Sequence, residues 1–419
     1  MQGSKSAVWR AIPAIRNPAA SPRPASQMFR LFWNNPSESI WVDTEGFRNV
    51  GDGCVSAQAA TAPHVLLLEL EDQPGRHATG RSAAMFFESY GNPTVRALTR
   101  ASRAFLERPP TGFADVPLMK PRAAMIVADA AGLVRLDATP EGADAATTSR
   151  RISADEARRQ VPILRAGWVA GAVLDESGCD MEVAAIHQGY LRTARRAGVQ
   201  MVLGAAGLTM RRLGGVWFVQ SRAGQFRAPV LVNATGAWAD SVARQAGAAT
   251  VGLQPMRRTA ITIAAPSGMD SRHWPMVIDV DETVYFKPDA GQLLLSPANE
   301  DPMEPCDVAA EELDVAIAVD RFQTVTTERV ARINHRWAGL RSFVVDRSPV
   351  VGYDTQAEGF FWLAGQGGYG IQMAPALARA AAALVLGRTL PDDVLHKGVT
   401  AEALSPGRAA LHTPVQSRS

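Results

Sequence analysis

Two arginines in mostly apolar surroundings are the first candidates for chemistry. Arg258 lies in PMRRTAI and Arg341 lies in AGLRSF. A guanidinium in such surroundings needs an anionic partner, because an unpaired buried charge is very costly. A substrate carboxylate held by paired hydrogen bonds would supply that partner, and a structural salt bridge to an aspartate such as Asp346 is the alternative. Tyr285 could donate to the same carboxylate, or it could simply lie at the surface.

A glycine cluster near the C-terminus is the second candidate. In FFWLAGQGGYGIQ, an apolar run over residues 361–364 is followed by Gly365, Gly367, Gly368 and Gly370, and then by an alanine-rich helix. Glycine permits positive φ and close approach to the main chain. A helix N-terminus adds free N–H groups and positive partial charge. The pattern predicts a site for something flat, acidic or electron-rich, and a glycine-eased strand-to-helix turn is the alternative.

The third candidate is the stretch that begins HVLLLELED. Glu69 stands at the end of an apolar run, where an acidic residue of a dinucleotide-binding fold bonds the adenosine ribose. The tract HATGRSAAMF that follows supplies small residues, Ala83 and Ala84, against which a large ring could lie. A tight strand-to-helix connection is the alternative interpretation of that tract.

The elements that must position these residues can be read from periodicity. The apolar run Val65 to Leu68 predicts a buried parallel strand. Residues 93–107 predict an amphipathic helix with Pro93 near its start. Residues 1–62 show no clear periodicity. Strands are also expected over residues 122–136, 216–233, 257–297, 337–343 and 349–352, and helices over 180–197 with Asp180 as the cap, up to Gly247, and over 308–333.

The predicted fold class is α/β with mixed α+β character. Rossmann-like segments alternate along the chain with β-rich ones, so a nucleotide-binding domain assembled from discontinuous pieces, with an inserted β-rich substrate domain, is expected. The expected division is an N-terminal extension, disordered, over residues 1–50; the nucleotide-binding domain over 51–112, 176–250 and 336–405; the substrate domain over 113–175 and 251–335; and a tail over 406–419.

Composition limits the function classes. The 419 residues carry a formal charge of +2, which does not indicate a nucleic-acid partner. The three cysteines, Cys54, Cys179 and Cys306, are widely spaced and form no metal-binding or disulfide pattern. No apolar run approaches the roughly 20 residues that a transmembrane helix needs. We therefore expect a protein of a reducing compartment, the cytoplasm, with no bound metal.

As a set, the motifs resemble the FAD-dependent D-amino acid oxidase family in its broad sense, which includes glycine and sarcosine oxidases. The similarity is greatest to bacterial D-arginine dehydrogenases and covers roughly residues 64–405, in order. It rests on VLLLELEDQPGRHATGRSAAMFFESYG, VLVNATGAWAD, LQPMRRTA, YFKPDAG, WAGLRSF and GFFWLAGQGGYGIQ.

The resemblance implies that FAD is the cofactor. The glycine-rich turn would place backbone amides at the pyrimidine end of the isoalloxazine, and Glu69 would hold the ribose. The cofactor-binding positions implied in this way are Gly51, Gly53, Glu69, Thr79, Ser82, Ala83, Ala84, Gly236, Gly367, Gly368, Tyr369, Gly370, Ile371 and Gln372.

The resemblance also implies the reaction. Arg258 and Arg341 match carboxylate-binding arginines, and Tyr90, Tyr285, Gly339 and Gly368 match substrate-lining positions. A D-amino acid would lose a hydride from Cα to flavin N5, and the imino acid released would hydrolyse to a 2-oxo acid. The electrons would pass to a quinone, a carrier or O2.

Departures from the family pattern sharpen two expectations. At the expected G-x-G-x-x-G, Gly51 and Gly53 are present but Ser56 replaces the third glycine and no apolar strand precedes it, so pyrophosphate binding is left open. One hypothesis is that residues 1 to about 62 derive from a shifted reading frame or a misassigned start.

The second departure concerns the substrate side chain. Ala124 stands where D-arginine dehydrogenases carry a glutamate, and Met85 and Phe87 replace a histidine and a threonine. A pocket of this kind favours apolar D-amino acids over D-arginine.

Two other functions remain open at this point. One is a related flavoenzyme that acts on glycine, an N-methyl amino acid or a 2-hydroxy acid, since paired arginines suit any carboxylate. The other is a non-catalytic chain whose nucleotide-binding loop is defective.

Overall fold

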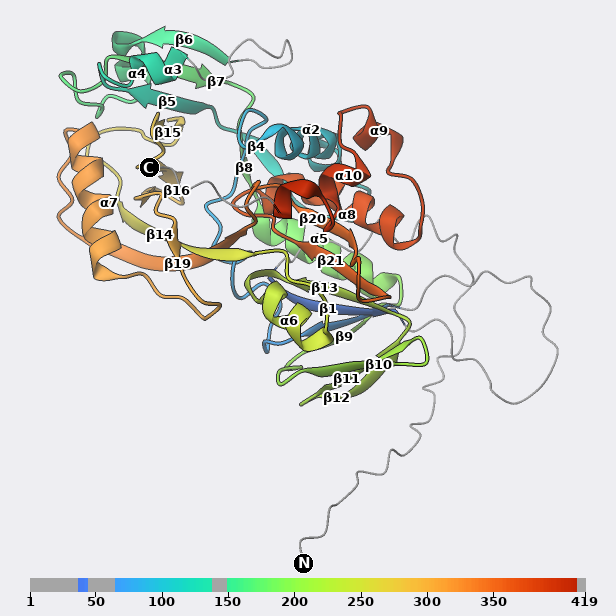
Figure 1. Ribbon diagram of the computed structural model, residues 1–419. Coiled ribbons are helices and arrows are strands. Elements are labelled where there is room, and N and C mark those ends of the chain that lie inside the picture. The colour runs from blue at the N-terminus through green and yellow to red at the C-terminus, as the bar shows by residue number, and fades with distance from the viewer. Residues whose placement is uncertain (1–36, 44–64, 138–148, 413–419) are drawn as a thin grey trace, which may run out of the picture.

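The computed structural model describes residues 37–43, 65–137 and 149–412 of the chain. Two large sheets carry the fold, and helices lie against both of them (Figure 1). Segments far apart in the sequence meet in each sheet, as the alternation of Rossmann-like and β-rich segments predicted. The mixed α/β fold class is confirmed.

The first sheet has six strands in the order β20-β21-β13-β1-β2-β9. β2 pairs in parallel with β9, and β13 in parallel with β21. β1 is antiparallel to both of its neighbours, and β20 is antiparallel to β21. The strands are β20 (Val350–Tyr353), β21 (Phe360–Ala364), β13 (Val230–Thr235), β1 (Ser37–Asp43), β2 (Val65–Glu69) and β9 (Gln200–Val202).

β1 corrects one expectation. Residues 1–50 were expected to be disordered, but Ser37–Asp43 forms a strand between β2 and β13. Its run Ile40-Trp41-Val42 consists of strong strand formers, but three residues are too few to show a period. The partners on either side come from residues 65–69 and 230–235, so the pairing that orders the segment is entirely non-local.

Alternation along the strands explains how helices cover this sheet. Phe361 and Leu363 face a core shared with α2 (Pro93–Glu107), α5 (Val183–Arg196) and α8 (Gly370–Val385). Phe360 and Trp362 face the opposite core. That second core is shared with α6 (Ala239–Ala246) and with a small sheet of β10 (Thr209–Leu213), β11 (Val216–Ser221) and β12 (Gly224–Ala228), which lie below the main sheet in Figure 1.

The second sheet has nine strands. Phe286 and Leu293 pack under helix α7 (Glu312–Val325), whereas Tyr285 and Leu294 point to the other face. The strands are β18 (Asp301–Pro302), β14 (Gln254–Ala264), β17 (Gln292–Ser296), β16 (Tyr285–Asp289), β15 (Met276–Asp279), β5 (Ala124–Ala128), β7 (Gly171–Asp175), β6 (Ser149–Ser153) and β19 (Ile333–Phe343), the last paired with β14.

A short three-stranded sheet lies between the parts of the molecule that contain the six-stranded and the nine-stranded sheet. It consists of β3 (Met85–Phe86), β8 (Cys179–Met181) and β4 (Met119–Pro121). The division into domains remains a prediction. Residues 337–343, assigned there to the nucleotide-binding domain, are the second half of β19 and pair with β14 in the nine-stranded sheet.

Several element boundaries differ from the sequence prediction. Residues 122–136 do not stay extended, because a turn at Gly132, whose N–H donates to Asp129 Oδ1, starts helix α3 (Leu133–Asp137). α5 starts at Val183 and Asp180 is not its cap. Asp180 instead lies in β8, where its carboxylate pairs with Arg122 and Lys287. The remaining short helices are α4 (Ala154–Gln160), α9 (Asp392–Leu395) and α10 (Ala401–Leu404).

Other expectations are confirmed. The helix over residues 93–107 has the predicted bounds, with Pro93 in its first turn. α6 ends in the left-handed Gly247. Within the described part of the chain, no helix has the length and apolarity needed to cross a membrane.

Candidate functional site

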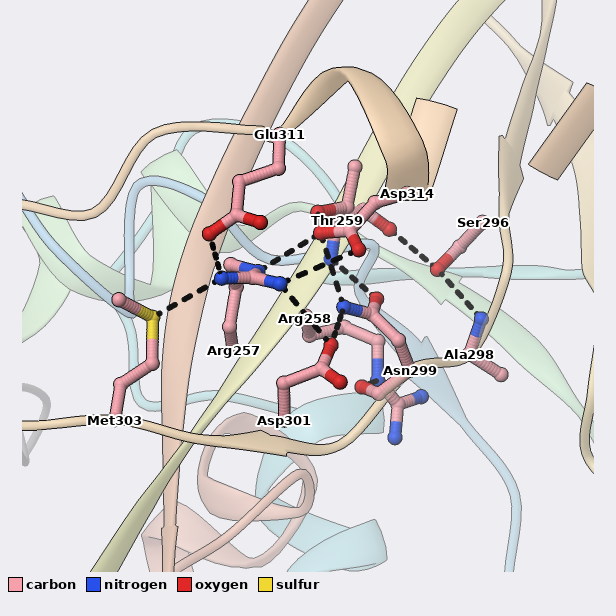
Figure 2. A network of polar contacts seen from close by, with 10 residues as sticks. All are labelled: Arg257, Arg258, Thr259, Ser296, Ala298, Asn299, Asp301, Met303, Glu311 and Asp314. Atoms are coloured by element: carbon pink, nitrogen blue, oxygen red, sulfur yellow. Dashed lines mark hydrogen bonds and ion pairs between the residues drawn. The ribbon is translucent and has the colours of Figure 1, made fainter. Parts of the chain in front are cut away.

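Two neighbouring arginines on β14 point to opposite faces of the nine-stranded sheet. Arg257 points toward α7, where its Nε donates to Asp314 Oδ2 at 2.8 Å and its Nη1 pairs with Glu311. Asn299 Nδ2 donates to the same carboxylate of Asp314 at 3.2 Å. Figure 2 shows Arg257 inside this network and the guanidinium of Arg258 turned away from it. Because successive strand residues alternate between faces, Arg258 is left for the other side of the sheet.

Strand register brings Arg258 and Arg341 together. Arg258 pairs with Gly339 across β14 and β19, and Met256 pairs with Arg341. Gly339 and Arg341 are two residues apart and so share a face. The two arginines are therefore diagonal neighbours on one face, at a separation that long side chains bridge. The backbone geometry therefore agrees with the sequence prediction that Arg258 and Arg341 converge.

Both arginines open into one cavity of about 1160 Å³, measured out to its mouth. Residues from the nine-stranded sheet, from the connections that follow β2 and β21, and from the start of α8 line it. Most of the predicted site lies along its wall: Thr79, Ser82, Ala83, Ala84, Met85, Phe87, Tyr90, Arg258, Tyr285, Gly339, Arg341, Gly367, Gly368, Gly370, Ile371 and Gln372.

Six other predicted residues lie elsewhere or cannot be placed, and Glu69, described below, is one of them. Ala124 is buried behind the cavity wall, in one apolar cluster with Phe87 and Tyr285. Tyr369 is buried beside the cavity, with its ring 5.0 Å from that of Tyr90. Gly236 lines a second cavity of about 420 Å³ that shares Arg81 and Gly367 with the first. Gly51 and Gly53 lie outside the described residues.

Arg258 and Tyr285 are buried, whereas Arg341 is half-buried. Arg258 is 7% exposed, and burial followed by the like charge of Arg341 lowers its pKa. Burial raises the pKa of Tyr285, but the positive charges of Arg341 and Arg258, with hydrogen bonds to Ser296 and Arg341, hold it below its usual value. The phenol therefore lies in a field that favours negative charge. A carboxylate would find two guanidiniums and a hydroxyl in the same place.

Asp346, the alternative partner considered for these arginines, is engaged elsewhere. It accepts hydrogen bonds from Arg408 Nε at 2.7 Å and Nη2 at 2.9 Å. Within the described chain, Arg258 instead pairs with Glu300, whose Oε1 lies 2.9 Å from Nη2.

The glycine-rich turn forms one wall of the cavity. Gly367 has φ of +54°, and a Cβ built there would stand 2.2 Å from the ring of Phe343. A Cβ on Gly368 would stand 3.1 Å from Arg341 Nη1. α8 then begins without a side-chain cap, so the first-turn N–H groups, including those of Gly370 and Ile371, lack intrahelical partners. The turn presents bare backbone and helix-dipole charge to whatever occupies the cavity.

Another part of the wall comes from the stretch between β2 and β3. Ala84 has φ of +46°, which is uncommon for a residue with a Cβ. Its N–H donates to Ser82 Oγ at 3.1 Å, and its carbonyl accepts from Met181 N at 3.1 Å. These bonds hold a tight bend whose small side chains, including Ala83, leave room for a flat ring.

Glu69 has the features of a ligand-binding carboxylate. It is 0% exposed, Oε1 accepts from Glu71 N at 3.2 Å, and Oε2 has no partner among the described residues. Burial raises its pKa from 4.5 to about 7. A buried carboxylate oxygen without a donor is costly, and a ribose hydroxyl would supply that donor. With the glycine-rich turn, this residue fits FAD.

Another part of the cavity wall is apolar. Met85 and Phe87 line it together with Met276 and Ile278 from β15. Tyr90 closes one side, and its hydroxyl donates to Glu282 Oε2 at 3.3 Å.

Sequence reasoning missed part of this wall. Ala260, Met276, Ile278, Glu282, Ala298 and Arg81 line the cavity as well. For the strand residues a usable signal existed, since Ala260 is two positions from Arg258 and so shares its face. Arg81 carried no such signal, because it is positioned by carbonyls of Val308 and Ala338, more than 200 residues away.

Comparisons with known proteins agree with this geometry. The model of the family described as FAD dependent oxidoreductase (DAO) matches residues 53–384. The uncharacterized oxidoreductase YurR of Bacillus subtilis is 26% identical over 251 residues, which cover 58% of this chain and 64% of that protein. The match thus spans less than two thirds of that relative.

Solved structures show the same fold. Glycine oxidase from Geobacillus kaustophilus aligns with a TM-score of 0.66 and 20% identity, over 78% of this chain and 89% of its own. Iminodiacetate oxidase from Chelativorans sp. BNC1 aligns with a TM-score of 0.67 and 19% identity, over 81% and 91%.

Proposed function

Because the chain belongs to the DAO family of FAD-dependent oxidoreductases, we propose that it oxidises D-amino acids to 2-oxo acids, with apolar side chains preferred. The observation that carries this proposal is the convergence of Arg258, Arg341 and Tyr285 on one cavity that the glycine-rich turn also borders.

The chain's own residues bind and orient the substrate. Arg341 and the free edge of Arg258 hold the carboxylate, and Tyr285 donates to it. This grip fixes the neighbouring Cα–H relative to the wall formed by Gly367 and Gly368. Bound FAD supplies the chemistry, which is acceptance of a hydride from Cα. The imino acid that leaves hydrolyses in water.

Residues that line the two cavities, together with the buried Glu69 and Tyr369, would hold FAD. Glu69 would accept a hydrogen bond from the ribose, and Ser82, Ala83 and Ala84 would leave room for the ring. The amides of Gly368, Gly370, Ile371 and Gln372 would offset negative charge at the pyrimidine end. Thr79, Gly236 and Tyr369 complete the surroundings.

The preference for apolar side chains rests on the wall beyond the carboxylate site. Met85, Phe87, Met276 and Ile278 offer no carboxylate to a guanidinium or an ammonium, and the carboxylate of Glu282, which also lines the cavity, already accepts from the hydroxyl of Tyr90. Ala124, where a glutamate would be needed, is buried in the same apolar cluster. Against these four apolar side chains, a D-arginine side chain would lose hydration without gaining a partner from them.

A substrate panel tests the proposal. Flavin-loaded enzyme is assayed with an artificial electron acceptor against D-Leu, D-Met, D-Phe, D-Arg, D-Lys, L-Leu, glycine, sarcosine and 2-hydroxy-4-methylpentanoate. The proposal predicts the highest kcat/KM with D-Leu, D-Met or D-Phe, at least about tenfold above D-Arg, since one missing polar partner is worth over 1.4 kcal/mol. A preference for D-Arg, glycine, sarcosine or the hydroxy acid would contradict it.

A further inference from the structure

One edge of Arg258 is already occupied by the chain itself. Nε donates to the carbonyl of Asn299 at 2.7 Å, and Nη2 donates to Glu300 Oε1 at 2.9 Å. Both partners belong to the segment between β17 and β18, opposite the strand that carries Arg341. The orientation of this buried guanidinium is therefore set before any substrate arrives.

Glu300 is in turn held by a second arginine. Arg347 donates from Nη1 to Oε2 at 3.0 Å and from Nη2 to Oε1 at 2.7 Å, the paired geometry that fixes a carboxylate best. The Arg347 guanidinium also lies over the ring of Phe343, 3.9 Å from its centroid. The side chains of Glu300 and Arg347 are 32% and 43% exposed. A chain of contacts thus runs from the protein surface to Arg258.

This chain of contacts offsets the repulsion between the positive charges of Arg258 and Arg341. Arg258 and Arg341 carry like charges on one sheet face, and the charge of Arg341 disfavours the charged form of Arg258. Burial raises the pKa of Glu300, but the hydrogen bonds and charge of Arg347, and then the charges of Arg258 and Arg341, bring it below its usual value. Glu300 is therefore ionised at neutral pH and lies among three cations.

We propose that Glu300 is a positioning residue for Arg258, and that Arg347 acts on the site only by fixing Glu300. This inference rests on the proposed function, because it assumes that Arg258 and Arg341 bind the substrate carboxylate. Glu300 takes up one edge of Arg258, so the remaining edge is turned toward the cavity. The site then binds a monocarboxylate without first having to bring two mobile cations together.

The test uses flavin-loaded wild-type enzyme and the variants E300A, E300Q, R347A and E300A/R347A. Two readouts are measured: KM and kcat with the best substrate of the panel, and the Kd of 3-methylbutanoate from its perturbation of the flavin visible spectrum. The neutral 3-methylbutanamide is the control ligand. The second readout requires no turnover.

E300A is expected to raise KM and the Kd of 3-methylbutanoate about tenfold, with kcat within about twofold, because uniform binding is lost. E300Q keeps an oxygen that accepts from Arg258, so its KM and Kd are expected to stay within about threefold of wild type. R347A is expected to raise both about threefold, and E300A/R347A to match E300A, since Arg347 acts through Glu300.

E311A is the matched control. Glu311 pairs with Arg257, the neighbour of Arg258 on the same strand, but on the face turned to α7. Its loss is expected to leave KM and Kd unchanged.

Four results would overturn the inference: wild-type KM and Kd in E300A, an equal effect in E311A, an E300Q enzyme as impaired as E300A, or additive effects of E300A and R347A. Failure of the proposed function looks different. There the wild-type enzyme itself would turn over no D-amino acid and would show no preference for 3-methylbutanoate over its amide.

Discussion

At the scale of single residues, the site depends on how buried charges are balanced. Arg258 and Arg341 repel each other, and within the described residues Arg258 has only Glu300 as an ionic partner. A substrate carboxylate adds the second anion. Deleting Arg341 should therefore cost more binding than deleting a surface charge.

R341A is predicted to raise KM for a D-amino acid about 100-fold, corresponding to about 3 kcal/mol of lost interaction with a desolvated carboxylate. R341K should be less impaired, because it keeps the charge but loses the paired geometry. R336A is the control, since Arg336 lies on the same strand and pairs with the exposed Glu312. Steady-state kinetics measures all three. An R341A enzyme with wild-type KM would remove Arg341 from the site.

Glu69 gives a prediction in pH. Its pKa is about 7 in the folded protein against an ordinary 4.5, so the unfolded chain releases this proton first as pH rises. The contribution of Glu69 to the free energy of unfolding is therefore fully present below pH 4.5. It is lost as the pH rises to about 7, and the total loss is roughly 3 kcal/mol.

Thermal unfolding of the cofactor-free protein measures this effect. Between pH 5 and pH 7.5 the wild-type Tm should fall further than the Tm of E69Q, which has no such proton to lose. E69Q should also retain less FAD after dialysis. Parallel pH profiles for the two proteins would contradict the buried, unpartnered carboxylate.

At the scale of elements, the glycine-rich turn and α8 act as one unit. A side chain at Gly367 would meet the ring of Phe343, as a side chain at Gly189 on α5 would meet the ring of Phe113 at 2.4 Å. Gly367 is also at φ of +54°, where a residue with a Cβ costs about 1–2 kcal/mol.

G367A and G189A should therefore both lower Tm, but only G367A should also release flavin. Bound flavin per chain, read from visible absorbance after gel filtration, separates the two effects. Equal flavin content in the two variants would mean that the turn does not contact the cofactor.

The sequence predicted elements well where the signal was local. The helix over residues 93–107 has a full amphipathic pattern and Pro93 at its start, and β2 is a continuous apolar run. The sequence-based prediction was wrong where contacts between distant segments determine an element. β1 forms by pairing with β2 and β13. Asp180 does not cap α5 because its carboxylate pairs with Arg122 and Lys287.

The same distinction applies to the site. Arg258, Arg341 and Tyr285 were identifiable because charged or polar residues in strands demand partners. Glu300 and Arg347 were not, since nothing in SPANEDP or DRSPV indicates that the two meet 47 positions apart.

At the scale of the whole molecule, contacts between segments far apart in the sequence position the walls of the cavity. The nine-stranded sheet forms one side, and α7 supports it from behind through Arg257 and Asp314 (Figure 2). Asp314 is 4% exposed and also accepts from the hydroxyl of Thr259 at 2.7 Å.

D314A should lower the free energy of unfolding by about 3 kcal/mol, because it leaves a buried guanidinium short of its partner. E311A should cost less than about 1 kcal/mol, since Glu311 is largely exposed. Urea unfolding followed by circular dichroism measures both. Equal losses would show that α7 is not anchored through Asp314.

The central claim is that the two guanidiniums of Arg258 and Arg341 grip an acid group beside the flavin. The most direct measurement is anaerobic reduction of flavin-loaded enzyme, followed by loss of visible flavin absorbance, with D-leucine and with D-leucinamide at equal concentration. Rapid bleaching is expected with D-leucine, and with the amide the rate is expected to be lower by at least about 100-fold. Bleaching by D-leucinamide as fast as by D-leucine would contradict it.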